Sequence, residues 1–274
     1  MHACGMYNGT MFTNSLEAFE YWWKKGIKLF EIDIDRTDDG EYVACHDFCY
    51  STFKKMEIDD IPSICSREWF LNQKIFSKTT EGLTTMDLER IFELLRLHKD
   101  MSVMIDPKVY SYSLCCELLG KIRVLIEEYN INKNQVIFET YNMDMIQATK
   151  KFHEMLQYQH CIDDEIQMGT SAQIRELPVQ EQINILKQNE IKIISYPWKF
   201  MVERLDILKT LREEEFVIFS KTRNNIFSEL LIQAEVSVNL IDHLVTDIQR
   251  IELSDYKKEY FKKYAEEINV YFKR

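Results

Sequence analysis

Glycine and proline are scarce in this 274-residue chain, which contains seven of the former and four of the latter. Because these residues punctuate linkers and low-complexity tracts, their scarcity predicts a single domain over residues 1–274. No apolar run approaches the length that spans a bilayer, and the first residues lack the basic and apolar parts of a signal peptide. We therefore expect a cytoplasmic protein without a transmembrane segment.

Basic residues are also in the minority, since 34 Lys and Arg stand against 45 Asp and Glu, for a formal net charge of −11. This balance argues against a nucleic-acid partner and against docking on an anionic membrane. A protein of this sign that handles phosphate must screen it locally, most simply with a bound divalent cation. The seven cysteines include the adjacent pair Cys115 and Cys116 and no C-x-x-C, which indicates reduced thiols rather than disulfides or structural zinc.

What the sequence does contain is an alternation of short β-rich runs with longer helical patterns. Strands are expected at 27–34, 42–45, 102–105, 135–138, 156–160, 191–196, 216–220 and 243–246, and helices at 86–98, 114–129, 143–152, 171–188, 202–212, 225–234 and 256–272. With the chain start counted as a first strand, this pattern predicts an α/β fold, a (β/α)8 TIM barrel. A doubly wound open sheet also fits, but no glycine-rich dinucleotide loop supports it. The segment 48–83 fits no unit and is expected to be an insertion that covers the active site.

The run from Leu29 to Arg36 places carboxylates where a barrel strand would bury them. Side chains alternate across a strand, so Glu31, Asp33 and Asp35 share one face and apolar residues share the other. In a barrel the acidic face points to the interior. Carboxylates crowded there repel one another, so either their pKa values rise or they bind a hard cation such as Mg²⁺ or Ca²⁺. A solvated edge strand with a charged face is the alternative, and this pattern alone does not separate the two.

Further polar residues follow the expected strands and favour the metal site. His46 and Asp47 come directly after the short strand 42–45, Asp106 follows the apolar strand 102–105, and Lys108 comes two positions later. Barrels gather their catalytic groups at the carboxyl ends of strands. Two acids from one strand, a third from another, a histidine and a lysine form a set suited to phosphoryl transfer.

These motifs resemble the glycerophosphodiester phosphodiesterase family, within the wider group of phosphatidylinositol-specific phospholipase C-like barrels. The matching series reads His2, Asn14-Ser15-Leu16-Glu17-Ala18-Phe19, Gly26, Glu31-Ile32-Asp33, Thr37-Asp38-Asp39-Gly40, Val43, His46-Asp47, Asp106-Pro107-Lys108 and Leu244-Val245-Thr246-Asp247. The match is strong over roughly the first fifty residues and at Asp106–Lys108, and elsewhere it rests on the order of strands.

The resemblance implies a metal-dependent phosphodiester hydrolase that cleaves small or lipid-derived glycerophosphodiesters to glycerol 3-phosphate and an alcohol. It implies that one divalent cation, Mg²⁺ or Ca²⁺, is held by Glu31, Asp33 and Asp106. His2 and His46 would then be the catalytic acid and base.

Two further residues complete the expected site. The resemblance implies that Lys108 binds the phosphate of the substrate. Trp198 follows the strand 191–196 and is expected either to bind substrate at the rim of the site or to pack in the core.

Three positions depart from the family pattern. Ala3 replaces the Arg that usually follows the first His, and Asp106 replaces a usual Glu. His2 has no strand-forming residues before it, so either the first strand is stunted or the natural start lies upstream. Two alternative functions therefore stay open, namely a phospholipase-like hydrolase of a lipid or polymer phosphodiester and a catalytically degenerate barrel that serves as a binding module.

Overall fold

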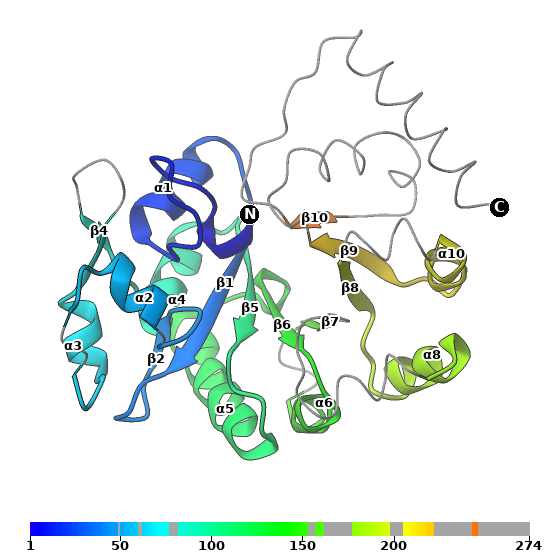
Figure 1. The fold of residues 1–274 in the computed structure, drawn as a ribbon. Coiled ribbons are helices and arrows are strands. Elements are labelled where there is room, and N and C mark those ends of the chain that lie inside the picture. The colour runs from blue at the N-terminus through cyan, green and yellow to red at the C-terminus, as the bar shows by residue number, and fades with distance from the viewer. Residues whose placement is uncertain are drawn as a thin grey trace, which may run out of the picture. The chain divides into compact units, whose positions relative to one another are not determined.

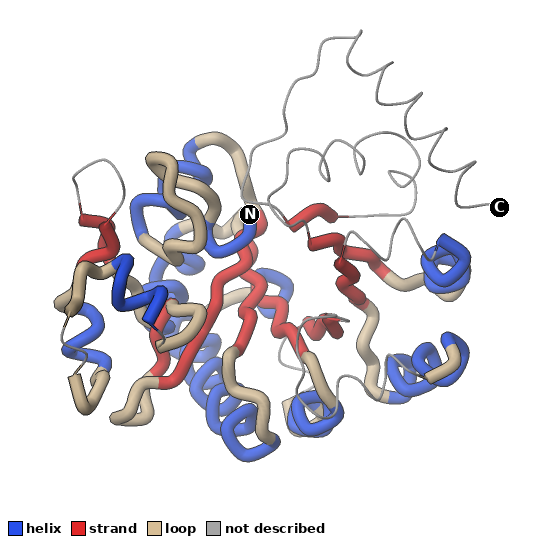
Figure 2. The backbone as a smooth tube through the Cα atoms, in the orientation of Figure 1, coloured by secondary structure: helices blue, strands red, loops and turns tan. Residues whose placement is uncertain are grey.

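The computed structural model of the chain describes residues 1–48, 50–59, 62–76, 82–152, 157–161, 177–197, 205–221 and 243–245. The chain divides into two compact units, Met1–Tyr158 and Gln159–Arg274. In both units strands alternate with helices along the sequence (Figure 1, Figure 2). The expected helices 225–234 and 256–272 and the residue Trp198 lie outside the described residues. No helix in the described part of the chain is long and apolar enough to cross a membrane.

A sheet with the strand order β2-β1-β5-β6 forms the centre of the first unit. Its strands are β1 (Leu29–Arg36), β2 (Tyr42–Ala44), β5 (Ser102–Pro107) and β6 (Val136–Thr140). β1, β5 and β6 run parallel, whereas β2 returns antiparallel to the end of β1. Its longer helices are α1 (Leu16–Lys24), α4 (Leu88–Leu97), α5 (Tyr112–Tyr129) and α6 (Met143–Thr149). A helix therefore separates successive parallel strands, as a β/α sequence pattern requires.

Each of these helices begins after a residue whose side chain caps it. The hydroxyl of Ser15 accepts the N–H of Ala18 at the start of α1, and Ser111 caps α5 in the same way. Asp87 caps α4 with its carboxylate at 2.8 Å, and Asn142 caps α6 with its amide oxygen at 2.9 Å. Such caps satisfy backbone donors that the first helical turn leaves open, so these residues fix where the helices start.

The two faces of β1 have opposite character. Phe30, Ile32 and Ile34 are fully buried, and the ring of Phe30 packs on Phe19 of α1 with centroids 4.5 Å apart. The acidic side chains of β1 point to the other face, because successive side chains of a strand alternate. Since Asp33 pairs in register with Asp106 of β5, that face collects acids from both strands.

The start of the chain is not the full strand that the barrel pattern predicts. Met1 alone pairs with β1, since its ammonium donates to the Leu29 carbonyl at 2.6 Å and its carbonyl accepts the Glu31 N–H at 2.7 Å. The 3-10 turn η1 (His2–Cys4) follows, in which Ala3 and Cys4 have φ angles of +44° and +65°. Residues 2–4 therefore form no strand, in line with the stunted first strand that the sequence left open, because a left-handed backbone cannot continue a strand.

The segment 48–83 contains short elements of its own. These are α2 (Tyr50–Lys55), α3 (Arg67–Leu71), β3 (Lys74–Phe76) and β4 (Gly82–Thr84), of which the two strands pair antiparallel. Met56, Phe70, Ile75 and Leu83 form one buried apolar cluster with Val43 of β2. The described residues of the segment thus pack on the hairpin of β1 and β2. Its helices and strands are too short for hydrophobic periodicity in the sequence to predict them.

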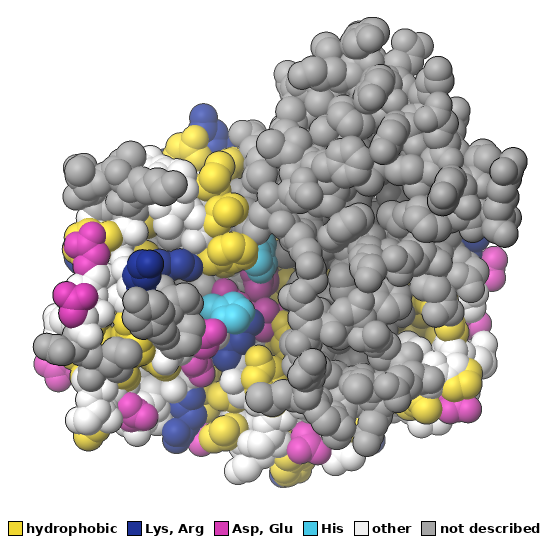
Figure 3. All heavy atoms as spheres, viewed as in Figure 1, with side chains coloured by type: hydrophobic (Ala, Val, Ile, Leu, Met, Phe, Trp, Pro, Cys, Tyr) yellow, Lys and Arg dark blue, Asp and Glu magenta, His cyan; other side chains and the backbone are white. Residues whose placement is uncertain are grey.

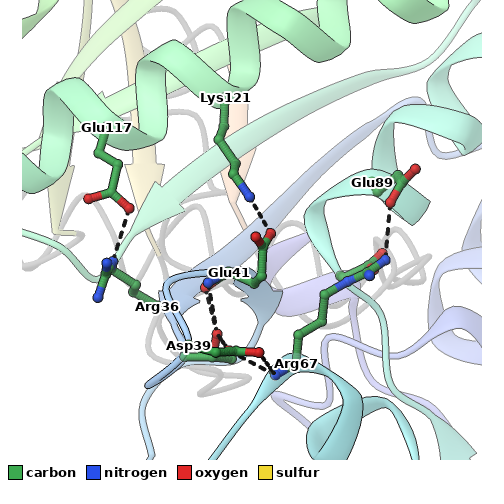
Figure 4. A network of polar contacts seen from close by, with 9 residues as sticks. Arg36, Asp39, Glu41, Arg67, Glu89, Glu117 and Lys121 are labelled. Atoms are coloured by element: carbon green, nitrogen blue, oxygen red, sulfur yellow. Dashed lines mark hydrogen bonds and ion pairs between the residues drawn. The ribbon is translucent and has the colours of Figure 1, made fainter.

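Charged side chains around the turn between β1 and β2 form a second kind of connection, which we call the hairpin network (Figure 4). Its members are Arg36, Asp39, Glu41, Arg67, Asp87, Glu89, Glu117 and Lys121. Arg36 donates to Glu117 of α5 at 3.2 Å, and Lys121 of α5 donates to Glu41. Arg67 bridges Asp87 and Glu89 at the start of α4. The network therefore ties the hairpin to three helices of the first unit.

The second unit contains the strand order β7-β8-β9-β10. These strands are β7 (Gln157–Cys161), β8 (Ile193–Pro197), β9 (Val217–Lys221) and β10 (His243–Val245), and each pairs parallel with the next. α8 (Val179–Gln188) precedes β8, and α10 (Leu205–Glu213) precedes β9. All four strands lie within a few residues of the positions that the sequence predicts.

Candidate active site

Three carboxylates meet on the face of β1 and β5 that lies opposite Phe30 and Ile32. One oxygen from each of Glu31, Asp33 and Asp106 lies within 4.8 Å of the other two, and all three residues are at most 3% exposed. We call this set the acid cluster. Buried carboxylates at this separation repel, and a hard divalent cation with oxygen ligands relieves the repulsion. The structure thus brings together the three acids that the sequence nominates as metal ligands.

Lys108 lies against the acid cluster. Its Nζ is 2.8 Å from Asp33 Oδ1 and 2.9 Å from Asp106 Oδ2. Burial opposes the charge of the ammonium, but Asp106, Asp33 and Glu31 outweigh burial and raise the pKa of Lys108 well above its usual value. Burial alone would raise the pKa of Asp33, but the charge of Lys108 reverses the effect and lowers it. Among the described residues, this one ammonium lies beside three carboxylates, and a divalent cation would add further positive charge to the set.

His2 reaches the acid cluster from the turn η1. Its Nε2 lies 3.8 Å from Glu31 Oε2, and its ring packs edge-on against Phe12 with centroids 5.0 Å apart. The carbonyl of Phe12 accepts a hydrogen bond from Lys55 of α2 at 3.3 Å. The segment 48–83 therefore contacts the residue that positions the ring of His2.

His46 follows β2 and is the more exposed of the two histidines. Its Nδ1 lies 2.9 Å from Asp47 Oδ2, and the hydroxyl of Thr52 donates to Asp47 Oδ1 at 3.4 Å. This contact favours the tautomer with the proton on Nδ1, which leaves Nε2 for proton transfer. Both imidazoles act electrostatically on Asp33, so both belong to the surroundings of the acid cluster. Figure 3 shows histidine side chains beside acidic and basic ones on one face.

Asp35 shares the acidic face of β1 but is not a member of the acid cluster. Burial raises the pKa of Asp35 to about 6, although the backbone N–H of Arg36 partly offsets the effect. The face therefore contains one carboxylate that binds a proton more readily than usual and one, Asp33, that is held ionised by Lys108.

Two residues near the start of the chain join the site without having been expected there. The amide of Asn14 donates from Nδ2 to Asp33 Oδ2 at 2.8 Å and accepts the backbone N–H of Asp33 on Oδ1 at 3.2 Å. The backbone N–H of Ala3 donates to Glu31 Oε2 at 2.6 Å. Asn14 is visible in the sequence as part of the motif before α1, but nothing in the sequence signals the role of the Ala3 backbone.

Glu139 is a third residue that the sequence reasoning missed. It lies in β6, where Phe138 pairs in register with Ile105, so Glu139 neighbours Asp106 on the same face. Its side chain is fully buried and accepts a hydrogen bond from the hydroxyl of Tyr141 at 2.7 Å. A single acid within the apolar run of β6 is a signal of the same kind as the acids of β1.

Comparison with known proteins identifies the family of the chain. The model of the glycerophosphoryl diester phosphodiesterase family matches residues 6–236, which is well over half of the chain. Among functionally curated proteins no sequence matches this chain.

Several solved structures are similar in fold. A glycerophosphodiester phosphodiesterase from Parabacteroides distasonis is 16% identical with a TM-score of 0.64, and the match covers 96% of this chain and 97% of that one. The enzyme from Thermotoga maritima is 18% identical with a TM-score of 0.61, covering 92% and 91%. A phosphodiesterase from Oleispira antarctica, solved with the product sn-glycerol-3-phosphate, is 14% identical with a TM-score of 0.62, covering 93% and 91%.

These likenesses show an α/β fold of the TIM-barrel type. The family match over residues 6–236 goes further, because it spans the acid cluster, Lys108 and His46. The chain belongs to the glycerophosphoryl diester phosphodiesterase family, whose members are phosphoric diester hydrolases.

Proposed function

We propose that the protein is a metal-dependent phosphodiesterase that cleaves glycerophosphodiesters to glycerol 3-phosphate and an alcohol. The observation that carries the proposal is the meeting of Glu31, Asp33 and Asp106 within 4.8 Å on the inward face of a β/α sheet. A substrate anion would be repelled by three carboxylates alone, so the chemistry requires a cation at this position. The structure of the Oleispira relative with sn-glycerol-3-phosphate supports the choice of product.

The acid cluster fits one divalent cation, Mg²⁺ or Ca²⁺. Glu31, Asp33 and Asp106 supply only oxygen ligands, which these hard ions prefer. When bound, the cation would neutralise negative charge on the phosphate and polarise its P–O bonds.

The residues of the chain itself account for phosphate binding and proton transfer. Lys108 places an ammonium beside Asp33 and Asp106 and would contact a phosphate oxygen. His46, held by Asp47, and His2, beside Glu31, lie in the surroundings of the acid cluster. One imidazole would take the proton from the nucleophile and the other would give a proton to the leaving alkoxide. The nucleophile would be either water, which gives glycerol 3-phosphate directly, or the glycerol hydroxyl next to the phosphate. In the second case the alcohol leaves from a cyclic phosphate, which water then opens to glycerol 3-phosphate.

The proposal extends to the whole chain. We assign residues 1–274 to one closed (β/α)8 barrel, in which the segment 48–83 is an insertion that covers the active site. The contact of Lys55 with the carbonyl of Phe12 supports this placement of the insertion. We also propose Trp198, which follows β8 in the sequence, as a residue that contacts the leaving group.

The meeting of the acids also bears on the binding-module alternative. A barrel that served only as a binding module would gain nothing from three buried carboxylates in one place, because their mutual repulsion destabilises the fold. The alternative of a lipid substrate differs from this proposal in the leaving group of the substrate.

The test is hydrolysis of a panel of glycerophosphodiesters and an aryl phosphodiester with Mg²⁺, with Ca²⁺ and with EDTA. We expect turnover that requires one of the metals and falls by about a hundred-fold or more in His46→Ala. His98→Ala is the matched control, because His98 stacks on Trp23 with ring centroids 4.0 Å apart and serves packing. Turnover that is indifferent to EDTA, or no turnover with any substrate and metal, would contradict the proposal.

A further inference from the structure

Asn14 occupies an unusual position at the edge of β1. Its backbone φ is +48° and its side chain is 2% exposed. The carbonyls of Lys28, just before β1, and of Ile34 accept backbone N–H groups from the β5 side of the sheet. The backbone of the odd-numbered Asp33 therefore points to the opposite edge of β1. There the Asp33 N–H meets Oδ1 of Asn14 instead of a neighbouring strand. Asn tolerates the left-handed conformation better than most residues, which fits this position.

The same side chain also selects one oxygen of the Asp33 carboxylate. Asn14 Nδ2 donates to Oδ2 at 2.8 Å, whereas Oδ1 faces Lys108 Nζ, also at 2.8 Å. The Asn14 amide therefore holds Asp33 at two points, namely its backbone N–H and one oxygen of its carboxylate. A carboxylate held in this way cannot rotate about its last bond without losing a buried hydrogen bond.

Glu31 is held in a parallel manner. Ala3 N–H donates to Glu31 Oε2 at 2.6 Å, and the Ala3 carbonyl accepts the backbone N–H of Asn14 at 3.2 Å. One segment at the start of the chain thus fixes an oxygen on each of the two β1 carboxylates. Both contacts depend on left-handed backbone at Ala3 and Asn14, a kind of strain that is common beside functional sites.

We propose that Asn14 is a positioning residue that sets the affinity of the acid cluster for its divalent cation. The inference rests on the proposed function, because it concerns the same cation. Asn14 acts through Asp33, whose orientation it fixes, so that one carboxylate oxygen faces the cation before binding. Groups that orient metal ligands in this way contribute about 10- to 100-fold to affinity.

The decisive variant is Asn14→Gly, because glycine accepts the left-handed backbone and removes only the amide. Asn8→Gly is the matched control, since Asn8 belongs to the same N-terminal segment and is exposed with φ +47°. The dissociation constants of Mg²⁺ and Ca²⁺ are measured by titration calorimetry on the full chain, together with the midpoint of urea unfolding. If Asn14→Gly does not fold, Asn14→Ser is measured in its place, because its hydroxyl is too short to reach both contacts.

We expect the dissociation constant of the cation to rise roughly 10- to 100-fold in the Asn14 variant and to stay unchanged in Asn8→Gly. The metal concentration that gives half-maximal kcat should rise in parallel. A residue that served stability alone would lower the urea midpoint and leave the dissociation constant of the folded protein unchanged, which would overturn the inference. Absence of cation binding by the wild type would instead overturn the proposed function, and the inference with it.

Discussion

The acid cluster and the hairpin network are both built from carboxylates and cationic side chains of the first unit. The acid cluster is buried, whereas the pairs of the hairpin network are largely exposed, with Asp87 at 4% as the exception. Asp33 and Lys108 are 1% and 11% exposed, whereas Glu41 and Lys121 are 43% and 40% exposed. In water the charges of an exposed pair are screened, and the pair contributes little to stability. In the buried cluster the loss of one charge leaves its partners uncompensated. Similar residues can therefore connect structural elements in the hairpin network and bind a cation or substrate in the acid cluster.

The largest effect is expected from removing a carboxylate charge of the acid cluster. Asp33→Asn should lower kcat/KM by about a thousand-fold or more, because the residue contacts the cation position, Lys108 and Asn14 together. Steady-state hydrolysis with Mg²⁺ or Ca²⁺ and titration calorimetry of the same metal measure the change. Asp39→Asn in the hairpin network is the control and should keep its activity; equal losses in both variants would abolish the distinction.

The second effect concerns stability without metal. Lys108→Met should lower the free energy of unfolding in EDTA by about 3 kcal/mol or more, because Asp33 and Asp106 lose their buried counter-charge. Added Mg²⁺ or Ca²⁺ should restore part of the loss, since the cation would replace the missing charge. Urea unfolding with EDTA and with each metal measures both. A variant as stable as the wild type in EDTA would show that the buried pair stabilises nothing.

The third effect depends on pH. The pKa of Asp35 is raised by burial to about 6, above the value of about 3.9 that it has in the unfolded chain. The folded state therefore loses stability as the pH rises from about 4 to 6, and Asp35→Asn should remove that loss. We expect the variant to be more stable than the wild type by up to about 3 kcal/mol at pH 7, with little advantage at pH 4.

Asp39 in the hairpin network should behave in the opposite way. The hydroxyl of Thr37 lowers the pKa of Asp39, so Asp39→Asn should lose stability above pH 4 rather than gain it. Urea unfolding in EDTA over this pH range compares the two variants. If the free energy of unfolding changed with the same sign in both variants, burial would not explain the difference between Asp35 and Asp39.

The smallest effect is expected in the hairpin network itself. Lys121→Met should change the free energy of unfolding by only about 0.2 to 1 kcal/mol, because its contact with Glu41 is solvated on both sides. Raised salt should reduce the difference further. Thermal unfolding at two salt concentrations checks this, and a loss as large as that of Lys108→Met would contradict the comparison.

Much of the fold follows from local sequence patterns. The alternation in β1 separates Phe30 and Ile32 from Glu31 and Asp33, and the structure places the two sets on opposite faces. The parallel strands and their helices also lie close to the predicted positions, since hydrophobic periodicity is a local property. At the chain start the sequence left a stunted first strand open but did not predict the turn that follows Met1, because the left-handed conformation of Ala3 and Cys4 has no signal in those residue types.

The hairpin network illustrates what sequence patterns do not carry. Lys121 and Glu41 are 80 positions apart, and Arg36 and Glu117 are 81 apart, so no short motif links them. Their contacts exist because α5 packs beside the hairpin of β1 and β2. Charges of this kind are common on any surface, and their pairing depends on packing that periodicity does not predict.

The sequence by itself determined which residues of β1 share a face, because the side chains of a strand alternate with a period of two. It also determined that Asp106 and Lys108 share a face at the end of β5. Only the tertiary structure decided which oxygen of each carboxylate is held and which faces Lys108. The reason is physical: a carboxylate rotates freely in the unfolded chain, and its orientation is fixed only when Asn14 and the Ala3 backbone are folded against it.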